Sequence, residues 1–445
     1  MTMSIAADAE HEGGDELYSP QPLTVPKAFS LIPTVPEAYR PLLDHFVKVT
    51  TTSISCHRGV QNELCSTIVP MAFEVPYLLT AVLTLAAAHR HSSSPIKEDG
   101  QLELLKGNCL KQLRSALRHF KFKDHDQILA TILVLCMAEI VMPSSSNSSW
   151  RSHLHGAAAL SSQNRSCVGS SHSSSSDLLR RKYQALQSIA MACGSRRYEG
   201  GIFTIASRDD TAIDDLAGYS TGLLPIFGDI NDLDSLRMLS RSDFHCDQEP
   251  GPPHFDCNSP LDHQSHLLFD RIVALMAERD ISRSSQSSSW LPEAVHHDLY
   301  RLDEAYHHMA ILQVFRRGSL SVPLQLIDNS RQAILTCLSS MDYQSGPCPG
   351  VAALPPLFVA GSLCTSLGDR ERVRSLLRSM WIRYGMGNVR QCRTMLELWW
   401  KRQDTAAGLD EALPVMVGDG ESKEHRLDDL SAFTWSDGEH DILPY

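Results

Sequence analysis

The stretch ILATILVLCMAEIV at residues 128–141 decides the fold class of this chain. Apolar residues cover nearly every side of a helix with this sequence, so such a helix belongs in the centre of a helical core. Pro143 and the serines after it end the helix. Crossing a membrane takes about 20 apolar residues, which is more than this stretch offers. The sequence therefore predicts a buried core helix.

Half-buried helices are predicted on both sides of this segment. Over residues 102–120, apolar positions recur at helical spacing while lysines and arginines occupy the other faces. A helix at residues 77–91 begins after Pro76. Similar patterns predict helices at residues 41–47, 150–160, 178–192, 222–239, 261–278, 292–317, 323–341, 354–367, 370–383 and 388–404. Because strand alternation and fixed-period repeats are not evident, we predict an all-α fold, an irregular multi-helix bundle of about a dozen helices with disordered termini.

Charge is distributed unevenly along the chain. Of a net charge of −12, residues 404–445 contribute eleven acids against Lys423 and Arg426, and residues 1–30 contribute five against Lys27. The middle is therefore almost neutral and has no strong field for nucleic acid. We expect three regions: a disordered, acidic, proline-rich leader at 1–36, a helical domain at 37–404 with a serine-rich loop at 161–176, and an acidic-hydrophobic tail at 405–445.

Residue types that bind metals or catalyse reactions are present, but without the spacing that such sites need. The twelve cysteines are scattered and no apolar signal peptide opens the chain, so a secreted disulfide framework is not expected. A zinc site needs three or four converging ligands. The histidine clusters do not supply that set; they are His89 with His91, and His296, His297, His307 and His308. Sequence motifs of phosphate, dinucleotide or nucleophile sites are also absent, so we predict no metal, no cofactor, no catalytic residue and no enzyme.

Two charged clusters have structural explanations. Acids at Asp209, Asp210, Asp214 and Asp215 are interpreted as capping a helix start rather than as acid and base catalysts. Arginines at 370, 372, 374 and 378 lie on a predicted amphipathic helix. We expect these arginines to face solvent or to pair with neighbouring acids. The alternative is that they contact phosphate.

Several segments, taken in order, resemble one known family. LLDHFV at 42–47 and IVPMAFEVPYLLTAVLTLAAAHR at 68–90 are similar to its opening helices, and DQILATILVLCMAEI at 126–140 and WRSHLHGAAAL at 150–160 follow. Its closing helices are similar to LPPLFVAGSLC at 354–364, RERVRSLLRSM at 370–380 and MLELWWKRQD at 395–404. The family is the fungal-specific transcription factor domain, the helical region that follows the binuclear zinc cluster of many fungal regulators. The resemblance spans about residues 40–404.

The resemblance implies a nuclear protein that regulates transcription, often for one metabolic pathway such as secondary metabolism. The chain departs from the family's pattern in its cysteines. A binuclear zinc cluster uses six cysteines within about 30 residues, including Cys-x-x-Cys pairs, whereas the closest cysteines here are Cys56 and Cys65. The chain as given is therefore not expected to read DNA by itself, so either it works through a partner or an upstream coding segment is missing.

Acidic and apolar residues alternate near the C-terminus. Such a composition resists collapse into a core and suits folding into a partner's groove as a short amphipathic helix. We predict an activation segment whose apolar side chains are Leu427, Leu430, Phe433, Trp435, Ile442 and Leu443. Docking of this tail on its own domain is the alternative.

The expected function is that of a nuclear transcription regulator that acts through its helical domain without its own DNA-binding module. Its expected partners are other transcription regulators or coactivators, with DNA reached only indirectly and no membrane involved. A small-molecule effector bound between helices and a homo- or heterodimer are further expectations. The alternatives are a helical metabolite-binding or degenerate regulator-derived protein with no transcriptional role, a truncated form of a zinc-cluster activator, and an enzyme with an unfamiliar site.

Overall fold

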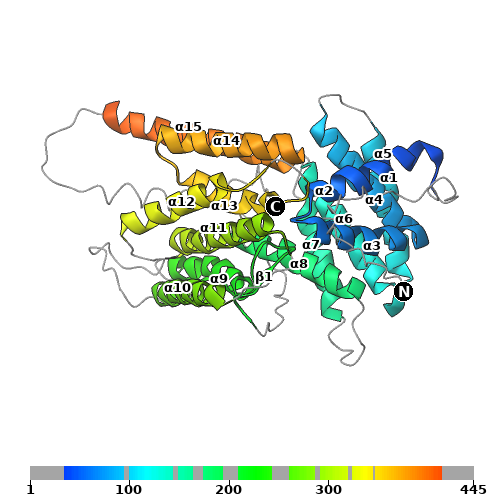
Figure 1. Cartoon of the computed structure of the whole chain (residues 1–445), viewed down its shortest axis with the longest axis horizontal. Coiled ribbons are helices and arrows are strands. Elements are labelled where there is room, and N and C mark those ends of the chain that lie inside the picture. The colour runs from blue at the N-terminus through cyan, green and yellow to red at the C-terminus, as the bar shows by residue number, and fades with distance from the viewer. Residues whose placement is uncertain are drawn as a thin grey trace, which may run out of the picture. The chain divides into compact units, whose positions relative to one another are not determined.

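Helix α6, His125–Val141, is surrounded by the other N-terminal helices (Figure 1). Every residue over 128–141 is buried, which confirms the sequence prediction. The neighbours of α6 include α4 (Pro76–Ser93), α5 (Gln101–Arg118), α7 (Ser149–Gln163) and α8 (Ser174–Cys193). Burying one large aliphatic side chain contributes roughly 1.5–3 kcal/mol, so α6 supplies much of the driving force for packing these helices together.

The computed structural model describes residues 35–94, 100–143, 149–163, 174–193, 209–242, 260–285, 291–318, 323–343 and 346–412. The described residues from Pro41 onward form one compact unit by their internal contacts. The predicted leader before residue 35 and the predicted tail after residue 412 lie outside the described residues.

The chain enters the bundle through a run of short helical pieces. A 3-10 turn, η2 (Glu37–Tyr39), precedes α1 (Arg40–His45), the π-helical turn η3 (Phe46–Thr50) and α2 (Thr51–Ser53). Helix α3, Arg58–Glu74, follows and was not predicted from the sequence. It contains Pro70, which removes one backbone donor from the helix. Pro70 and Ser66 are both exposed, so the carbonyl that loses its partner lies on the solvent side.

A second group of helices surrounds α11, Glu293–Arg317. Leu302, Ala305, Met309 and Leu312 on α11 are fully buried. The neighbours of α11 include α9 (Leu223–Ser242), α10 (Pro260–Ser285), α12 (Leu324–Ser339), η7 (Pro349–Ala352) and α13 (Leu354–Ser362). The last two helices, α14 (Leu367–Tyr384) and α15 (Gly387–Ala412), pack on each other and on α13.

A two-stranded hairpin joins α8 to α9 in chain order. Strands β1 (Ile213–Asp214) and β2 (Tyr219–Ser220) pair antiparallel, with Ile213 opposite Ser220. The turn requires glycine at position 218, where φ is +84° and an added Cβ would lie 2.5 Å from the Leu302 side chain. This contact places the turn directly against α11.

The all-α prediction is confirmed, and the described helices correspond to nearly all of the predicted ones. Several boundaries differ. Helices α7 and α8 extend into the predicted serine-rich loop from both sides, and α15 continues to Ala412 instead of ending near residue 404. Helix α13 ends at Ser362, five residues before the predicted end. The small hairpin is the only sheet among the described residues.

Candidate functional site

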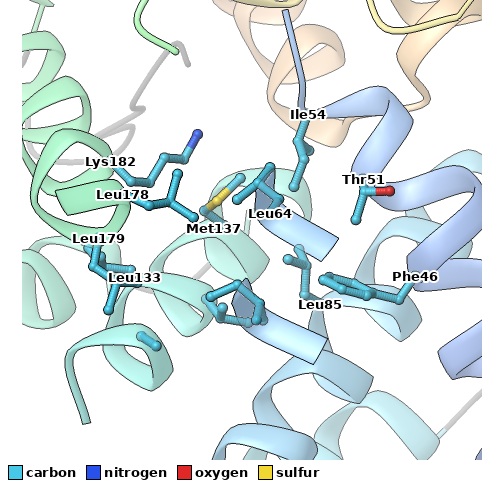
Figure 2. A pocket seen from close by; sticks show the side chains of 13 residues that line it. Phe46, Thr51, Ile54, Leu64, Leu85, Leu133, Met137, Leu178, Leu179 and Lys182 are labelled. Atoms are coloured by element: carbon cyan, nitrogen blue, oxygen red, sulfur yellow. The ribbon is translucent and has the colours of Figure 1, made fainter. Parts of the chain in front are cut away.

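A small apolar cavity lies between the N-terminal pieces and helices α3, α4, α6 and α8 (Figure 2). Its free volume is about 30 Å³, which is room for about one water molecule. The lining is Phe46, Thr51, Ile54, Leu64, Ile68, Leu85, Ala130, Leu133, Val134, Met137, Leu178, Leu179 and Lys182. Pockets for metabolites usually enclose about 300–1,000 Å³, so binding of an effector here requires the surrounding helices to move apart.

Lys182 on α8 is the one charged residue that lines the cavity. Only 4% of it is exposed, and this burial lowers the pKa of its amine to about 8. Burial likewise raises the pKa of the Cys56 and Cys136 thiols to about 12, so both neighbouring thiols are protonated at neutral pH. The cavity wall therefore combines an apolar surface with one amine that loses its charge easily.

Next to Lys182, Arg181 holds the hairpin against α8. Its Nε atom donates to Asp214 Oδ2 over 2.8 Å, and its Nη2 atom donates to Asp215. His57, just before α3, approaches Asp215 Oδ2 with Nε2 at 3.0 Å while its Nδ1 atom accepts from the Gly59 amide. Since Nδ1 accepts, Nε2 carries the proton and donates to Asp215. Burial alone would raise the pKa of Asp215, but His57 and Arg181 together lower it.

The acidic cluster does not begin a helix, so that prediction was wrong. Asp209 accepts hydrogen bonds from Thr211, and Asp214 Oδ1 accepts from the amides of Leu216 and Ala217 in the hairpin turn. Helix α9 starts only at Leu223. These carboxylates therefore stabilise turns, and two of them neutralise an arginine that lies far away in sequence.

A second polar junction connects the start and the end of the described chain. The buried His89 on α4 donates from Nε2 to the Tyr384 carbonyl over 2.7 Å, and its Nδ1 atom lies 3.2 Å from both His45 Nε2 and Thr50 Oγ1. Burial lowers the pKa of His89, which keeps this ring neutral. Ser92 donates to the Gly385 carbonyl over 2.6 Å. The α14–α15 turn is thus attached to the end of α4.

The remaining histidines and cysteines form no metal site in the part of the chain that the structure describes. His307 Nδ1 contacts the Asp303 carbonyl at 2.8 Å, and His308 Nδ1 contacts Ser330 Oγ at 3.2 Å. Within the described ranges no three histidine, cysteine or acidic side chains converge on one point. None of the described helices is long and apolar enough to cross a membrane.

The predicted arginine helix is α14, and its pairing with acids is confirmed. Arg370 Nη1 donates to Asp404 over 2.9 Å, and Arg374 Nε donates to Glu397 over 2.7 Å. Both guanidinium groups also lie over the Trp400 ring, at 5.5 and 4.9 Å from its centroid. Arg370 and Arg374 of α14 therefore hold α15 in place. This part of α14 is not available to bind phosphate.

The predicted activation segment lies in residues 413–445, outside the described residues. The sequence pointed to His89 only as a possible metal ligand, and it did not indicate the contacts made by Lys182 and Arg181. The partners of these residues cannot be identified from local spacing.

Comparison with known protein families matches residues 41–429 to the fungal specific transcription factor domain. The match begins at the first residue of the compact unit and includes every helix from α2 to α15. No curated protein and no solved structure matches this chain.

Proposed function

Because the chain belongs to the fungal-specific transcription factor domain family, a family of regulatory domains and not of enzymes, we propose that it regulates transcription in the nucleus through contacts with other regulators or coactivators. The observation that carries this proposal is the family match over residues 41–429 on an all-α bundle. The 445 residues reach DNA through those partners. We further propose that the protein controls the genes of one pathway, such as a pathway of secondary metabolism. Its family membership supports this proposal.

The charge of the helical body supports a role in protein contacts. The net charge of the chain is concentrated in its two acidic ends, and the body between them is almost neutral. Binding to DNA without a partner depends mainly on a positive field that attracts phosphates. A nearly neutral helical body suits contact with another protein, including a second copy of this chain or a related regulator.

The acidic-hydrophobic tail is the proposed activation segment. Apolar side chains from Leu427 to Leu443 are separated by acids that keep them soluble. A coactivator groove would order such a segment as an amphipathic helix, with the apolar residues buried and the acids outside.

Tethering the full chain to a heterologous DNA-binding domain upstream of a reporter tests this proposal. Wild type should activate the reporter, and the triple variant Leu430→Ala/Phe433→Ala/Trp435→Ala should lose most of that activity because it removes the groove-filling side chains. The matched control is Ser431→Ala/Thr434→Ala/Ser436→Ala in the same segment, which should retain it. Silence of the fusion, both in wild type and in a variant whose tail is freed from the helical body, would reject activation by this chain.

Response to a small-molecule effector is a second proposal, and the cavity beside Lys182 supports it. The cavity is apolar with one ionisable amine, which suits a mostly apolar ligand, but its closed volume of about 30 Å³ demands helix movement. Replacing Leu85 by Trp would fill the cavity. The reporter response to cell extracts containing the effector should then disappear, while basal activity of the tethered chain persists.

A further inference from the structure

We propose that the C-terminal tail, residues 413–445, docks on an exposed basic face of the α14–α15 hairpin and that this contact controls access to the activation segment. The basic face is defined by Arg378, Ile382, Arg390, Arg393, Leu398 and Lys401, all of them exposed. Only the regulatory consequence rests on the proposed function. The docking is a property of the folded chain and can be measured without transcription.

The register of the hairpin places two arginines opposite each other. Arg390 lies over the Trp381 ring at 4.9 Å, and Arg374 pairs with Glu397, so the two helices run antiparallel. Midway between these two contacts, Arg378 on α14 comes opposite Arg393 on α15. Neither arginine lies within ion-pair distance of another described residue, although the charge of Arg393 contributes to the lowered pKa of Glu397. Facing like charges are unfavourable, and an anion bound between them would remove this repulsion.

Most acids of the hairpin are already committed to other partners. Residues 367–412 hold nine arginines and lysines against six acids. Four of these acids are Asp369, Glu371, Glu397 and Asp404, which pair with Arg331, Arg374 and Arg370. The excess positive charge of the hairpin is therefore not cancelled from within. Residues 413–445 hold eight acids against Lys423 and Arg426 and have the opposite excess.

The basic face also exposes apolar surface that suits the tail. Ile382 is 75% exposed and Leu398 is 46% exposed, on the same hairpin as the unpaired arginines. In the tail, Phe433 and Trp435 lie between the acid pair Asp428–Asp429 and the acid at Asp437. A segment with acids on both sides of two aromatic residues can pair its carboxylates with arginines while its rings cover the exposed aliphatic side chains.

The tail is long enough to reach this face. Arg393 and the end of α15 at Ala412 are separated by about 29 Å at the helical rise of 1.5 Å per residue. From residue 413 to Leu427 an extended chain spans about 45–50 Å, so it can turn back along α15. The family match continues past α15 to residue 429, which supports including this part of the tail in the domain.

A short acidic peptide fits this face better than nucleic acid does. Glu371 and Glu397 pair with Arg374 next to this face. A short peptide can place its few carboxylates away from these two acids, whereas a continuous phosphate backbone cannot. The helical body adds no positive field beyond the hairpin. The attached tail also has a high effective concentration, since it is part of the same chain.

Hydrogen exchange of the full-length protein tests the docking. Amides over residues 427–441 should exchange slowly in wild type and about tenfold faster in Arg378→Glu/Arg393→Glu, a change equivalent to about 1.4 kcal/mol. The matched control is Lys111→Glu/Arg114→Glu on the exposed side of α5, which makes the same charge change at a distant site and should leave the tail protected. Unchanged exchange of α6 amides verifies that each variant is folded.

A compensating variant strengthens the test. Asp428→Lys/Asp429→Lys, combined with Arg378→Glu/Arg393→Glu, should restore slow exchange because the ion pairs are rebuilt with reversed sign. Two results would overturn the proposal: unprotected tail amides in wild type, or a tail whose protection the arginine reversal does not change. Protection of the basic face by added random-sequence DNA, with an unprotected tail, would assign the face to nucleic acid.

The effect of docking on transcription is tested in a separate experiment. In the tethered reporter, Arg378→Glu/Arg393→Glu should raise activity severalfold, because the released segment is open to coactivators. A protein with a docked tail and a silent reporter in both forms would reject activation while leaving the docking established.

Discussion

Replacing Lys182 by methionine should stabilise the protein at neutral pH. Burial lowers the pKa of this amine from 10.5 to about 8, so the unfolded chain holds the proton more tightly than the folded protein does. Folding therefore becomes more favourable as the pH rises from about 8 to 10.5. Methionine has a similar length, needs no proton and matches the apolar lining of the cavity.

The pKa difference sets the size of this effect. A difference of one pKa unit corresponds to 1.36 kcal/mol, so the shift of Lys182 corresponds to roughly 3 kcal/mol at pH 7, reduced by any contact that the ammonium group makes in the folded state. We expect Lys182→Met to raise the free energy of unfolding by about 2 kcal/mol at pH 7. At pH 10.5 the gain should nearly vanish, because the amine of the wild type is then neutral in the folded protein.

Urea denaturation followed by circular dichroism at several pH values between 7 and 10.5 measures this difference. Lys48→Met is the control, since Lys48 is exposed and its pair with Asp44 is at the surface, and it should change the stability little and without dependence on pH. Destabilisation by Lys182→Met of equal size across the whole range would refute the reasoning. It would show that the contacts of Lys182 in the folded state outweigh the penalty of its burial.

Three further substitutions test the packing and the ion pairs. Gly387→Ala should lower the free energy of unfolding by about 1–3 kcal/mol, because the new Cβ would lie 2.8 Å from the Val141 carbonyl. The control is Gly368→Ala, where the new Cβ meets open space. This control should not destabilise the protein in thermal melts. Leu133→Ala should cost about 2–5 kcal/mol in urea denaturation by enlarging the existing cavity. Asp215→Asn should destabilise the protein near neutral pH, and because the pKa of Asp215 is lowered in the folded state, wild type should lose this advantage as the pH falls through and below 3.8. An acid titration of both proteins in which their stability difference stays constant would contradict that role for Asp215.

Helix α3 shows how a local rule can miss an element. Its buried residues Val60, Leu64, Ile68 and Ala72 are each four positions apart, which is a helical stripe, but a narrow one. Pro70 disfavours a helix here, because proline removes a donor and disturbs the preceding turn. In the folded protein Pro70 faces solvent, where water can satisfy the freed carbonyl, so the penalty is small enough for tertiary packing of the stripe to prevail.

The sequence by itself determined the fold class, because the apolar run at residues 128–141 and its amphipathic neighbours have only one way to bury their faces, which is against other helices. The order of the segments likewise pointed to the family that the match over residues 41–429 shows. Helical periodicity is a local property, so it can be recognised in the sequence without knowledge of how the helices pack.

Only the tertiary structure decided which charged groups meet. Arg181 pairs with Asp214 from 33 residues away, His57 meets Asp215 from 158 residues away, and His89 reaches Tyr384 across 295 residues. No spacing rule connects positions so far apart, since their proximity results from how whole helices pack. For the same reason the two unpaired arginines became recognisable as neighbours only when the register of α14 against α15 was known.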